Sequence, residues 1–354
     1  MKSLKLQGKK FEKNQKTNPM NSTNYYLLTT NYLKTNNYLK RALLLFTTLL
    51  LFTGCSSKRQ QPSPDFVKPL FILNDSLYDD RGPGTYTYPV ALQDRDGIFD
   101  LKTLVVRDVG SSLEFEVVFL RPIHREGVQE ERYQKGWVHQ LIDIYLDLDR
   151  IPGSGYQFSL PGRDVEFKRE EAWDRMILLT PGPSRDVEDY LTGLSENKAL
   201  YEARTHIIVP DNVFVKTFSI IARVPKSRLG PMVEQPGIQV CVMGFSPDNL
   251  SLEGMQNAEV LRFPTQDSFG GGTEAHGESN LIDILSPDRD SQYQVLSAYR
   301  SSPYKPENLH PILPLIYPKS KQKAEKFRRK STNRNETTTK PLIEDRYMSA
   351  PQGW

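Results

Sequence analysis

The middle of the chain consists of short apolar runs, several of which alternate with polar residues. Residues 113–119 (LEFEVVF) and 141–147 (LIDIYLD) alternate with the two-residue period of a half-buried strand. Helix is predicted only for short segments such as 184–194. Further strands, separated by clusters of Gly, Pro, Asn and Asp, are predicted at 99–106, 176–179, 205–209, 213–224 and 238–245. This spacing is typical of an all-β sandwich or barrel rather than of alternating helices and strands.

The segment 78–89 (YDDRGPGTYTYP) combines two adjacent carboxylates, a Gly-Pro-Gly sequence and a Thr-Tyr repeat. Glycine adopts backbone angles that other residues avoid and proline fixes its own φ, so a sharp turn is predicted here. The repeat after the turn predicts a short strand with Tyr86 and Tyr88 on one face. Asp79 and Asp80 then lie at the rim of the turn, where they either contact a cation or cap the turn.

The amino end has the order of features found in a signal peptide. A basic stretch precedes an apolar run at 42–52, which is too short to span a bilayer but suits the apolar region of a signal peptide. The run ends in LFTGC, which resembles the lipobox of bacterial lipoproteins. We therefore expect residues 1–54 to be a signal peptide and Cys55 to carry a lipid that anchors the protein at the cell envelope. The polar segment 55–68 is predicted to be a tether.

Charge is unevenly distributed along the chain. The whole sequence has 46 basic and 43 acidic residues, but residues 1–54 hold nine basic residues and one acidic residue. That region is long for a signal peptide, so Met1 and Met20 are both candidate starts. The segment from residue 318 onward is also basic, which leaves 27 basic and 38 acidic residues in the body, a net charge of −11. An acidic body argues against nucleic-acid binding, which needs a basic face.

The strand pattern stops after residue 300. Five prolines make the next stretch extended, and the basic sequence that follows is too polar to form a core. We therefore expect a folded domain at 69–300 and a Pro-rich, basic, disordered tail at 301–354. With Cys55 lipidated, Cys241 has no partner for an intramolecular disulfide, and its apolar surroundings predict a buried side chain.

A series of short motifs appears in order along the body, including GPGTYTYP, LIDIYLDLD, LPGRDVEF, CVMGF and FGGG. In this order they resemble the C-terminal binding module of glucodextranases and of some amylopullulanases. That module is similar in fold to family-9 xylan-binding modules and DOMON domains. The resemblance covers residues 69–299 and implies an immunoglobulin-like or jelly-roll β-sandwich that binds carbohydrate. We expect no catalytic module of the kind that such domains accompany.

Aromatic side chains are the first candidates for a sugar site, because their faces stack on the C–H surfaces of sugars. The candidates are Trp137, Tyr86, Tyr88 and Tyr156. Trp137 follows a glycine in a loop-like stretch, so we expect it to be exposed. Trp173 and Tyr145 occur in or beside strand-like runs and are expected in the core instead.

Acidic pairs before turns are candidates for a metal site, because Ca²⁺ needs several oxygen ligands that converge from turns. Asp79 and Asp80 precede the Gly-Pro-Gly turn, and Asp147 and Asp149 precede a Pro-Gly turn. One reading is a structural calcium ion that holds the two turns together. The other is that these carboxylates accept hydrogen bonds from backbone N–H groups of their own turns.

The function predicted from these features is that of a non-catalytic, carbohydrate-binding lipoprotein of the cell envelope. One alternative is an adaptor or structural lipoprotein whose sandwich binds another envelope protein. A second alternative is a glycoside hydrolase, which requires two facing carboxylates. No sequence pattern selects such a pair; Asp164 and Glu166 share one face of a predicted strand, which indicates a solvated face. Nucleophile, phosphate-loop and zinc-site motifs are absent from the sequence.

Overall fold

The structure is a computed structural model that describes residues 67–125, 133, 135–193, 198–246, 256–273, 277–299 and 310–319. The predicted signal peptide, Cys55, nearly all of the tether and the tail beyond residue 319 lie outside the described residues. No helix in the described part of the chain has the length and apolar character needed to cross a bilayer.

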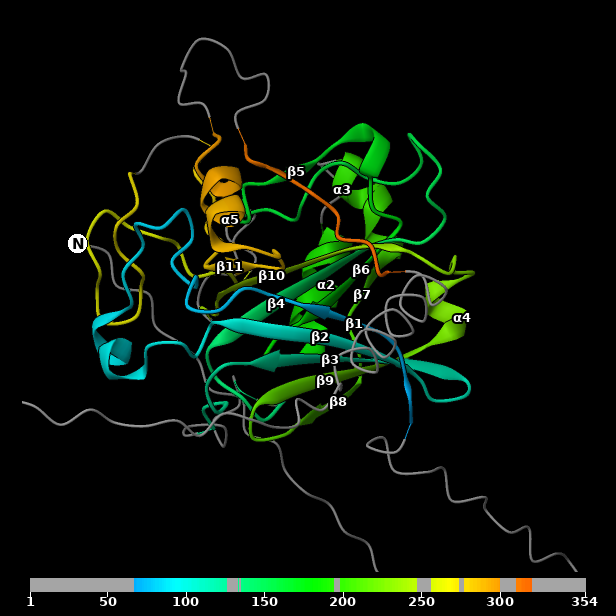
Figure 1. Ribbon diagram of the computed structural model, residues 1–354, viewed down its shortest axis with the longest axis horizontal. Coiled ribbons are helices and arrows are strands. Elements are labelled where there is room, and N and C mark those ends of the chain that lie inside the picture. The colour runs from blue at the N-terminus through cyan, green and yellow to red at the C-terminus, as the bar shows by residue number, and fades with distance from the viewer. Residues whose placement is uncertain are drawn as a thin grey trace, which may run out of the picture. The chain divides into compact units, whose positions relative to one another are not determined.

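Two five-stranded sheets form the framework of the domain (Figure 1). The first sheet has the order β1-β2-β3-β9-β8, and every neighbouring pair is antiparallel. Its strands are β1 (Pro69–Asn74), β2 (Leu101–Asp108), β3 (Ser112–Phe119), β8 (Asn212–Val215) and β9 (Ser219–Pro225). The predicted run at 213–224 therefore forms two strands joined by a turn.

The second sheet has the order β11-β10-β4-β6-β7 and is antiparallel except for the β6–β7 pair. Its strands are β4 (Gln140–Asp147), β6 (Arg175–Leu179), β7 (Ile207–Ile208), β10 (Gly237–Gly244) and β11 (Asp283–Ile284). A small parallel pair, β5 (Glu166–Phe167) with β12 (Ile312–Leu313), lies apart from both sheets in the pairing order. The all-β class predicted from the sequence is confirmed.

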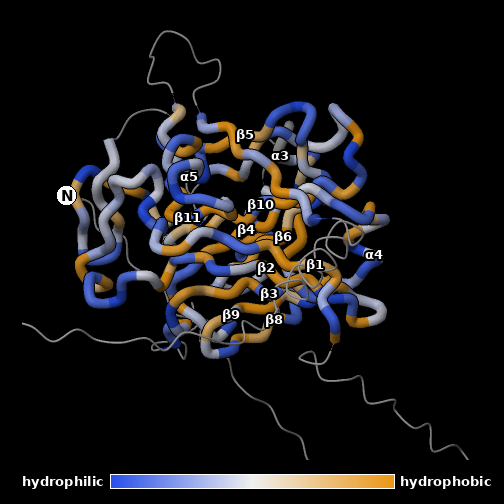
Figure 2. Tube along the Cα trace, in the orientation of Figure 1, coloured by the Kyte–Doolittle hydropathy of each residue, from blue (hydrophilic) through white to orange (hydrophobic). Residues whose placement is uncertain are grey.

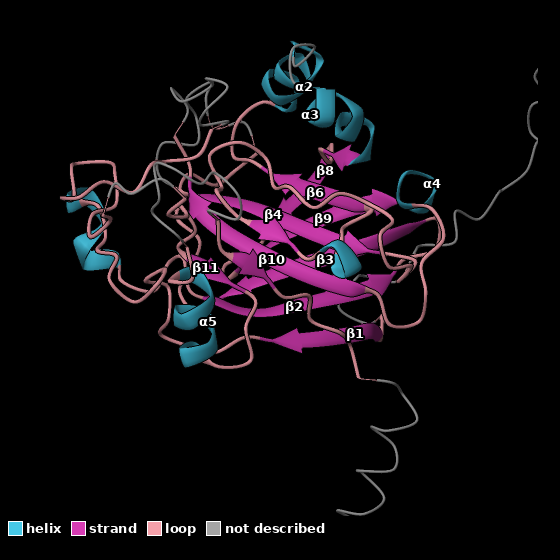
Figure 3. Cartoon of the chain, turned by 90° about the horizontal axis from the view of Figure 1, so that it is seen from above, coloured by secondary structure: helices cyan, strands magenta, loops and turns pink. Residues whose placement is uncertain are grey.

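Helices are short and occur between strands. They are α2 (Ser184–Gly193), α3 (Lys198–Ala203), α4 (Lys226–Leu229) and α5 (Arg289–Leu296), with 3-10 turns at Val90–Arg95, Arg169–Glu171 and Arg204–His206. The view in Figure 3 shows the strands at the centre of the domain, with helices α2, α3, α4 and α5 around them. Helix α2 matches the helix predicted at 184–194.

The main hydrophobic core lies between the two sheets. Alternate residues of β3 (Phe115, Val117) and of β4 (Ile142, Ile144) belong to the same buried cluster. Figure 2 shows hydrophobic residues concentrated along these strands. At about 25 cal/mol per Å² of apolar surface, this shared core is the chief source of stability of the sandwich.

The outer face of the first sheet is polar but ion-paired. Glu114 and Glu116 alternate with the core residues of β3, as the sequence predicts. Arg107 on β2 contacts Glu116 at 2.5 Å and Glu114 at 3.5 Å, and Arg223 on β9 contacts Glu114 at 3.0 Å. The alternation therefore separates a hydrophobic inner face from an outer face of crossed ion pairs.

The two central strands of the second sheet, β4 and β10, are covered on both faces. Every residue of β4 and β10 is buried. Their second face forms another hydrophobic cluster, in which Tyr145 and Met243 pack with Leu191 of α2, Leu296 of α5 and Leu313 of β12. Polar positions on this face are consequently inside the protein, which the alternating pattern alone did not predict.

Two local predictions from the sequence need correction. The Thr-Tyr repeat is not a strand: only Thr87 makes a bridge, to Gly270. The predicted start of the tail at residue 301 is also too early, because β12 pairs with β5 and Leu313 and Leu315 are buried. Both differences arise from contacts with distant segments of the chain.

Candidate functional site

Three of the four candidate sugar-binding aromatics are in the core. Trp137 is 0% exposed, and its Nε1 donates to the carbonyl of Gln140 at 2.7 Å. The predicted exposure of Trp137 is therefore wrong, because the loop that carries it folds against the sandwich. Tyr86 and Tyr88 are also buried; the hydroxyl of Tyr86 donates to the carbonyl of Ser279 at 2.5 Å. None of these three rings offers a free face to a ligand in this structure.

Tyr88 is buried because the Gly-Pro-Gly turn returns the chain toward the core. Its ring makes edge contacts with Phe99 and Phe269, at 5.6 and 5.4 Å between centroids, and its hydroxyl donates to Asp80. Gly82 in the turn has a φ of +56°, and a Cβ at this position would meet the Tyr86 ring at 2.2 Å. The motif is therefore a compact structural turn.

Tyr156 is the one candidate aromatic that reaches an open pocket. It is half-buried, and its ring packs on Trp173 at 5.1 Å between centroids. Trp173 and Tyr145 are buried, as predicted. The pocket has a volume of about 360 Å³, within the range of small-ligand sites. Its lining residues are Tyr156, Phe158, Ser159, Leu160, Pro161, Asp164, Val165, Glu166, Ala203 and His310.

The pocket combines an apolar wall with a cluster of polar side chains. Phe158 is 56% exposed and lines the same pocket as Tyr156. Asp164, Glu166 and His310 supply carboxylate and imidazole groups to the same space. An accessible aromatic surface beside planar polar groups is the arrangement that sugar rings require.

Local backbone pairing places these residues together. A bridge joins Tyr156 to Trp173 and another joins Phe158 to Glu166, so the segment lies against β5. The N–H of Glu166 donates to the carbonyl of Pro311 at 2.9 Å, which brings His310 alongside. Phe158 alternates with Tyr156 in the sequence and could have been found there. His310 could not, because only the β5–β12 pairing places it in the pocket.

A buried ion pair supports the loop that forms the pocket. Arg163 donates from Nε to Asp143 at 2.9 Å and from Nη2 to Asp143 at 3.3 Å, and both side chains are 0% exposed. Asp164, the next residue, has a left-handed backbone (φ +55°) and accepts a hydrogen bond from Asn280 at 3.2 Å. Burial raises the pKa of Asp164, although the charges of His310 and Arg163 oppose this shift.

The four predicted metal ligands do not come together. Asp79 groups with Asp75 and Asp283, whereas Asp147 and Asp149 group with Asp174. Asp283 pairs with Val242 and Asp147 with Gly237 along β10, five residues apart, or about 17 Å at the rise of a strand. The prediction that one calcium ion is bound by both turns is therefore wrong. Asp79 and Asp80 are also buried rather than at a rim.

The fold defines a class of protein, an all-β domain with a sandwich-like arrangement of two sheets. The family model of the C-terminal, SLH-like binding module of glucodextranase matches residues 70–311, and this chain belongs to that family. The match confirms the resemblance seen in the sequence. No curated protein matches the chain. The family is a binding module rather than a catalytic domain, which is compatible with a protein that is not an enzyme.

Proposed function

We propose that the pocket around Tyr156 and Phe158 binds a glycan, and that the protein is a non-catalytic, glycan-binding lipoprotein of the cell envelope. The observation that carries this proposal is an accessible aromatic wall beside Asp164, Glu166 and His310 in a single pocket. The aromatic surface stacks on the C–H face of a sugar ring, while the polar groups accept hydrogen bonds from its hydroxyls. Membership of a binding-module family supports the same conclusion.

The charge of the pocket narrows the class of glycan. Asp164 and Glu166 both line it, so a uronic acid or a sulfated sugar would bring a further negative charge close to two carboxylates. The negative charge of such a sugar and the charges of the two carboxylates would repel one another, and this repulsion is stronger in a partly buried pocket than in bulk water. A neutral glycan, or one with an amino group, therefore fits better than an acidic polysaccharide.

The experiment is a glycan-array screen of the full chain, followed by calorimetric titration with the best ligand. Phe158→Ala removes an exposed ring and should weaken binding by about tenfold while leaving the fold intact. Phe214→Ala is the matched control, because Phe214 is 47% exposed and does not line the pocket. Absence of glycan binding by the full chain, or equal losses in the two variants, contradicts the proposal.

The presence of two carboxylates in one pocket keeps a glycoside hydrolase as the second candidate. Incubating the bound glycan with the full chain and measuring new reducing ends distinguishes the two functions. Binding without cleavage supports the module. Cleavage that Glu166→Gln abolishes supports the hydrolase.

An adaptor that binds another envelope protein is the remaining alternative. If the protein is an adaptor, no glycan on the array should bind it. A partner protein should instead be cross-linked to the domain in the intact envelope. The lipid anchor at Cys55 is common to the adaptor and to the glycan-binding protein, so its test does not discriminate between them.

A further inference from the structure

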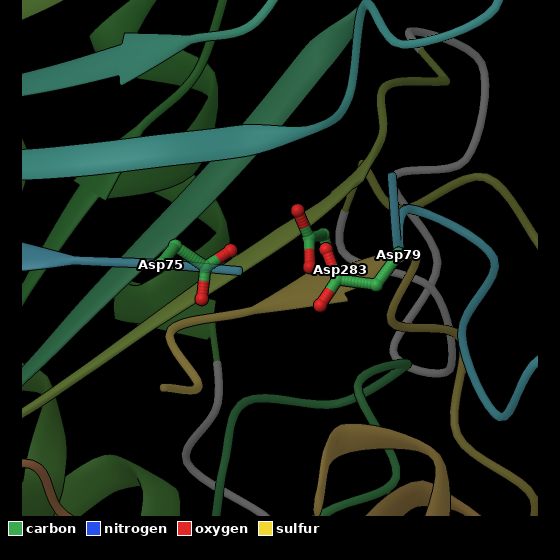
Figure 4. A group of neighbouring side chains, drawn as sticks. All are labelled: Asp75, Asp79 and Asp283. Carbon is green, nitrogen blue, oxygen red and sulfur yellow. The ribbon is translucent and has the colours of Figure 1, made fainter. Parts of the chain in front are cut away.

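A group of carboxylates lies where the edge strands of the two sheets approach each other. Asp75 follows β1, the edge strand of the first sheet, and Asp283 begins β11, the edge strand of the second. Asp79 comes from the segment that leads into the Gly-Pro-Gly turn. One carboxylate oxygen from each of the three lies within 4.8 Å of the others. Figure 4 shows the three carboxyl groups pointing toward one another.

Backbone N–H groups hold two of these side chains in place. Asp283 accepts hydrogen bonds from the N–H of Leu101 at 2.6 Å and of Ile284 at 2.9 Å. Asp75 accepts one from the N–H of Ser286 at 2.5 Å. Leu101 belongs to the first sheet and Ser286 follows the second, so the cluster already connects both sheets.

Several carboxylate oxygens of the cluster have no hydrogen-bond donor. Asp79 is 0% exposed, and neither of its oxygens makes a hydrogen bond of good geometry with a described residue, although the side chain of Ser76 is a nearby candidate donor. The Oδ2 of Asp75 is in the same situation, as is the Oδ1 of the neighbouring Asp100. Buried acceptors normally have donors, because an unmet one costs about 1–3 kcal/mol, or more when charged. Four such oxygens in one place point to a missing ligand.

Positive charge on the protein does not account for the cluster. Among the described residues, no salt bridge involves Asp75, Asp79 or Asp283. Arg289 acts on Asp79 through its charge, but its guanidinium donates to the carbonyl of Leu77 at 2.7 Å.

We propose that Asp75, Asp79 and Asp283 bind a divalent cation, and that this cation is Ca²⁺. The group contains only oxygen ligands, with no histidine or cysteine, which disfavours zinc and copper. Carboxylates from two segments, residues 75–79 and the start of β11, suit the variable coordination of Ca²⁺ better than the strict octahedron of Mg²⁺. The ion cross-links the edge strands of the two sheets and fixes the start of the Gly-Pro-Gly turn.

The second acidic group, Asp147, Asp149 and Asp174, differs from the first because its carboxylates accept hydrogen bonds from nearby N–H groups. Asp174 accepts hydrogen bonds from the N–H of Leu148 at 2.7 Å and of Asp149 at 3.2 Å. Asp147 accepts one from the N–H of Arg150 at 2.7 Å, and Asp149 is exposed. These carboxylates accept hydrogen bonds from the backbone N–H groups of residues 148–151, so we assign no ion to them.

The test uses the full chain, stripped of metal with a chelator and then titrated with calcium chloride. Equilibrium dialysis should detect one bound calcium ion at this site. Calcium at a hundred times its Kd should raise Tm by about 5–10 °C, because a ligand of the folded state stabilises it by mass action. A stripped protein that binds no calcium, or whose Tm does not respond to it, overturns the proposal.

Asp79→Asn tests the site through its effects on calcium affinity and on the Tm of the metal-free protein. It should weaken calcium binding by about tenfold or more, since it removes a charge from the ligand set. In the stripped protein it should leave Tm unchanged or raise it, because it removes a buried, unpaired carboxylate. A lowered Tm in the stripped protein together with unchanged calcium binding contradicts the assignment.

The matched control is Asp149→Asn, which alters the second acidic group and should leave the calcium response intact. Loss of the response in this variant would move the ion to the other group and overturn the assignment. If Asp79→Asn fails to fold, the partly exposed Asp75 provides Asp75→Asn as the second variant. None of these residues lines the sugar pocket, so the outcome is independent of glycan binding.

Discussion

Replacing Arg163 by methionine is expected to destabilise the protein more than most single substitutions do. The guanidinium makes two hydrogen bonds to Asp143, at 2.9 and 3.3 Å, and both side chains are fully buried. Tyr145 donates a further hydrogen bond to Asp143 at 3.0 Å. Arg163→Met leaves Asp143 charged, buried and held by the tyrosine alone.

The size of the effect follows from that uncompensated charge. Breaking a buried pair by removing one partner typically costs about 3–5 kcal/mol of unfolding free energy. We expect about 3 kcal/mol for Arg163→Met, at the low end of this range, because Tyr145 still donates to the carboxylate. For a domain of this size that loss lowers Tm by about 6–12 °C.

A double-mutant cycle measures the interaction directly. Urea titrations of wild type, Arg163→Met, Asp143→Asn and the double variant give four free energies of unfolding. The double variant should be more stable than Arg163→Met, because no unpaired charge remains. A loss below about 1 kcal/mol in Arg163→Met, or a double variant whose losses simply add, would refute the reasoning. The double variant should also bind glycan more weakly, since Arg163 supports the pocket loop.

Two further predictions concern pH and the amino end of the chain. Burial, the facing His124 and the charge of Arg95 lower the pKa of His139 to about 3. Below about pH 6.5 the unfolded chain therefore binds a proton at this histidine that the folded chain does not, so the free energy of unfolding decreases as pH falls. Urea titrations should show wild type losing about 2 kcal/mol more than His139→Gln between pH 7 and pH 5; equal losses contradict this. Cys55→Ser should abolish incorporation of radiolabelled palmitate, and retained label would contradict the predicted anchor.

The strands could be predicted from the sequence because their period is local. The predicted run 113–119 corresponds to β3 (Ser112–Phe119), and 141–147 corresponds to β4 (Gln140–Asp147). The run 238–245 corresponds to β10 (Gly237–Gly244) within one residue at each end. Side chains on a strand alternate between two faces whatever the rest of the fold does, so these positions are visible in the sequence.

Exposure could not be predicted in the same way, because it depends on what packs against each face. Asp143 occupies a polar position in the alternation of β4, which predicts a solvent-facing side chain. The structure instead covers that face with helices and with the β5–β12 pair, and Asp143 is buried with Arg163 as its partner. The prediction that Trp137 is exposed is wrong for the same reason, because a loop residue is exposed only if the loop stands clear of the core.

The sugar pocket and the proposed calcium site were likewise predictable from the sequence only in part. The sequence places Tyr156, Asp164 and Glu166 within one short segment, and it places Asp79 beside a turn. Whether His310 joins the first group, and Asp283 the second, depends on pairings between distant segments. Local patterns of hydrophobicity and turn residues fix the elements, because they act over a few residues. The convergence of side chains depends on strand register and sheet packing, and these are decided only when the whole chain buries its core.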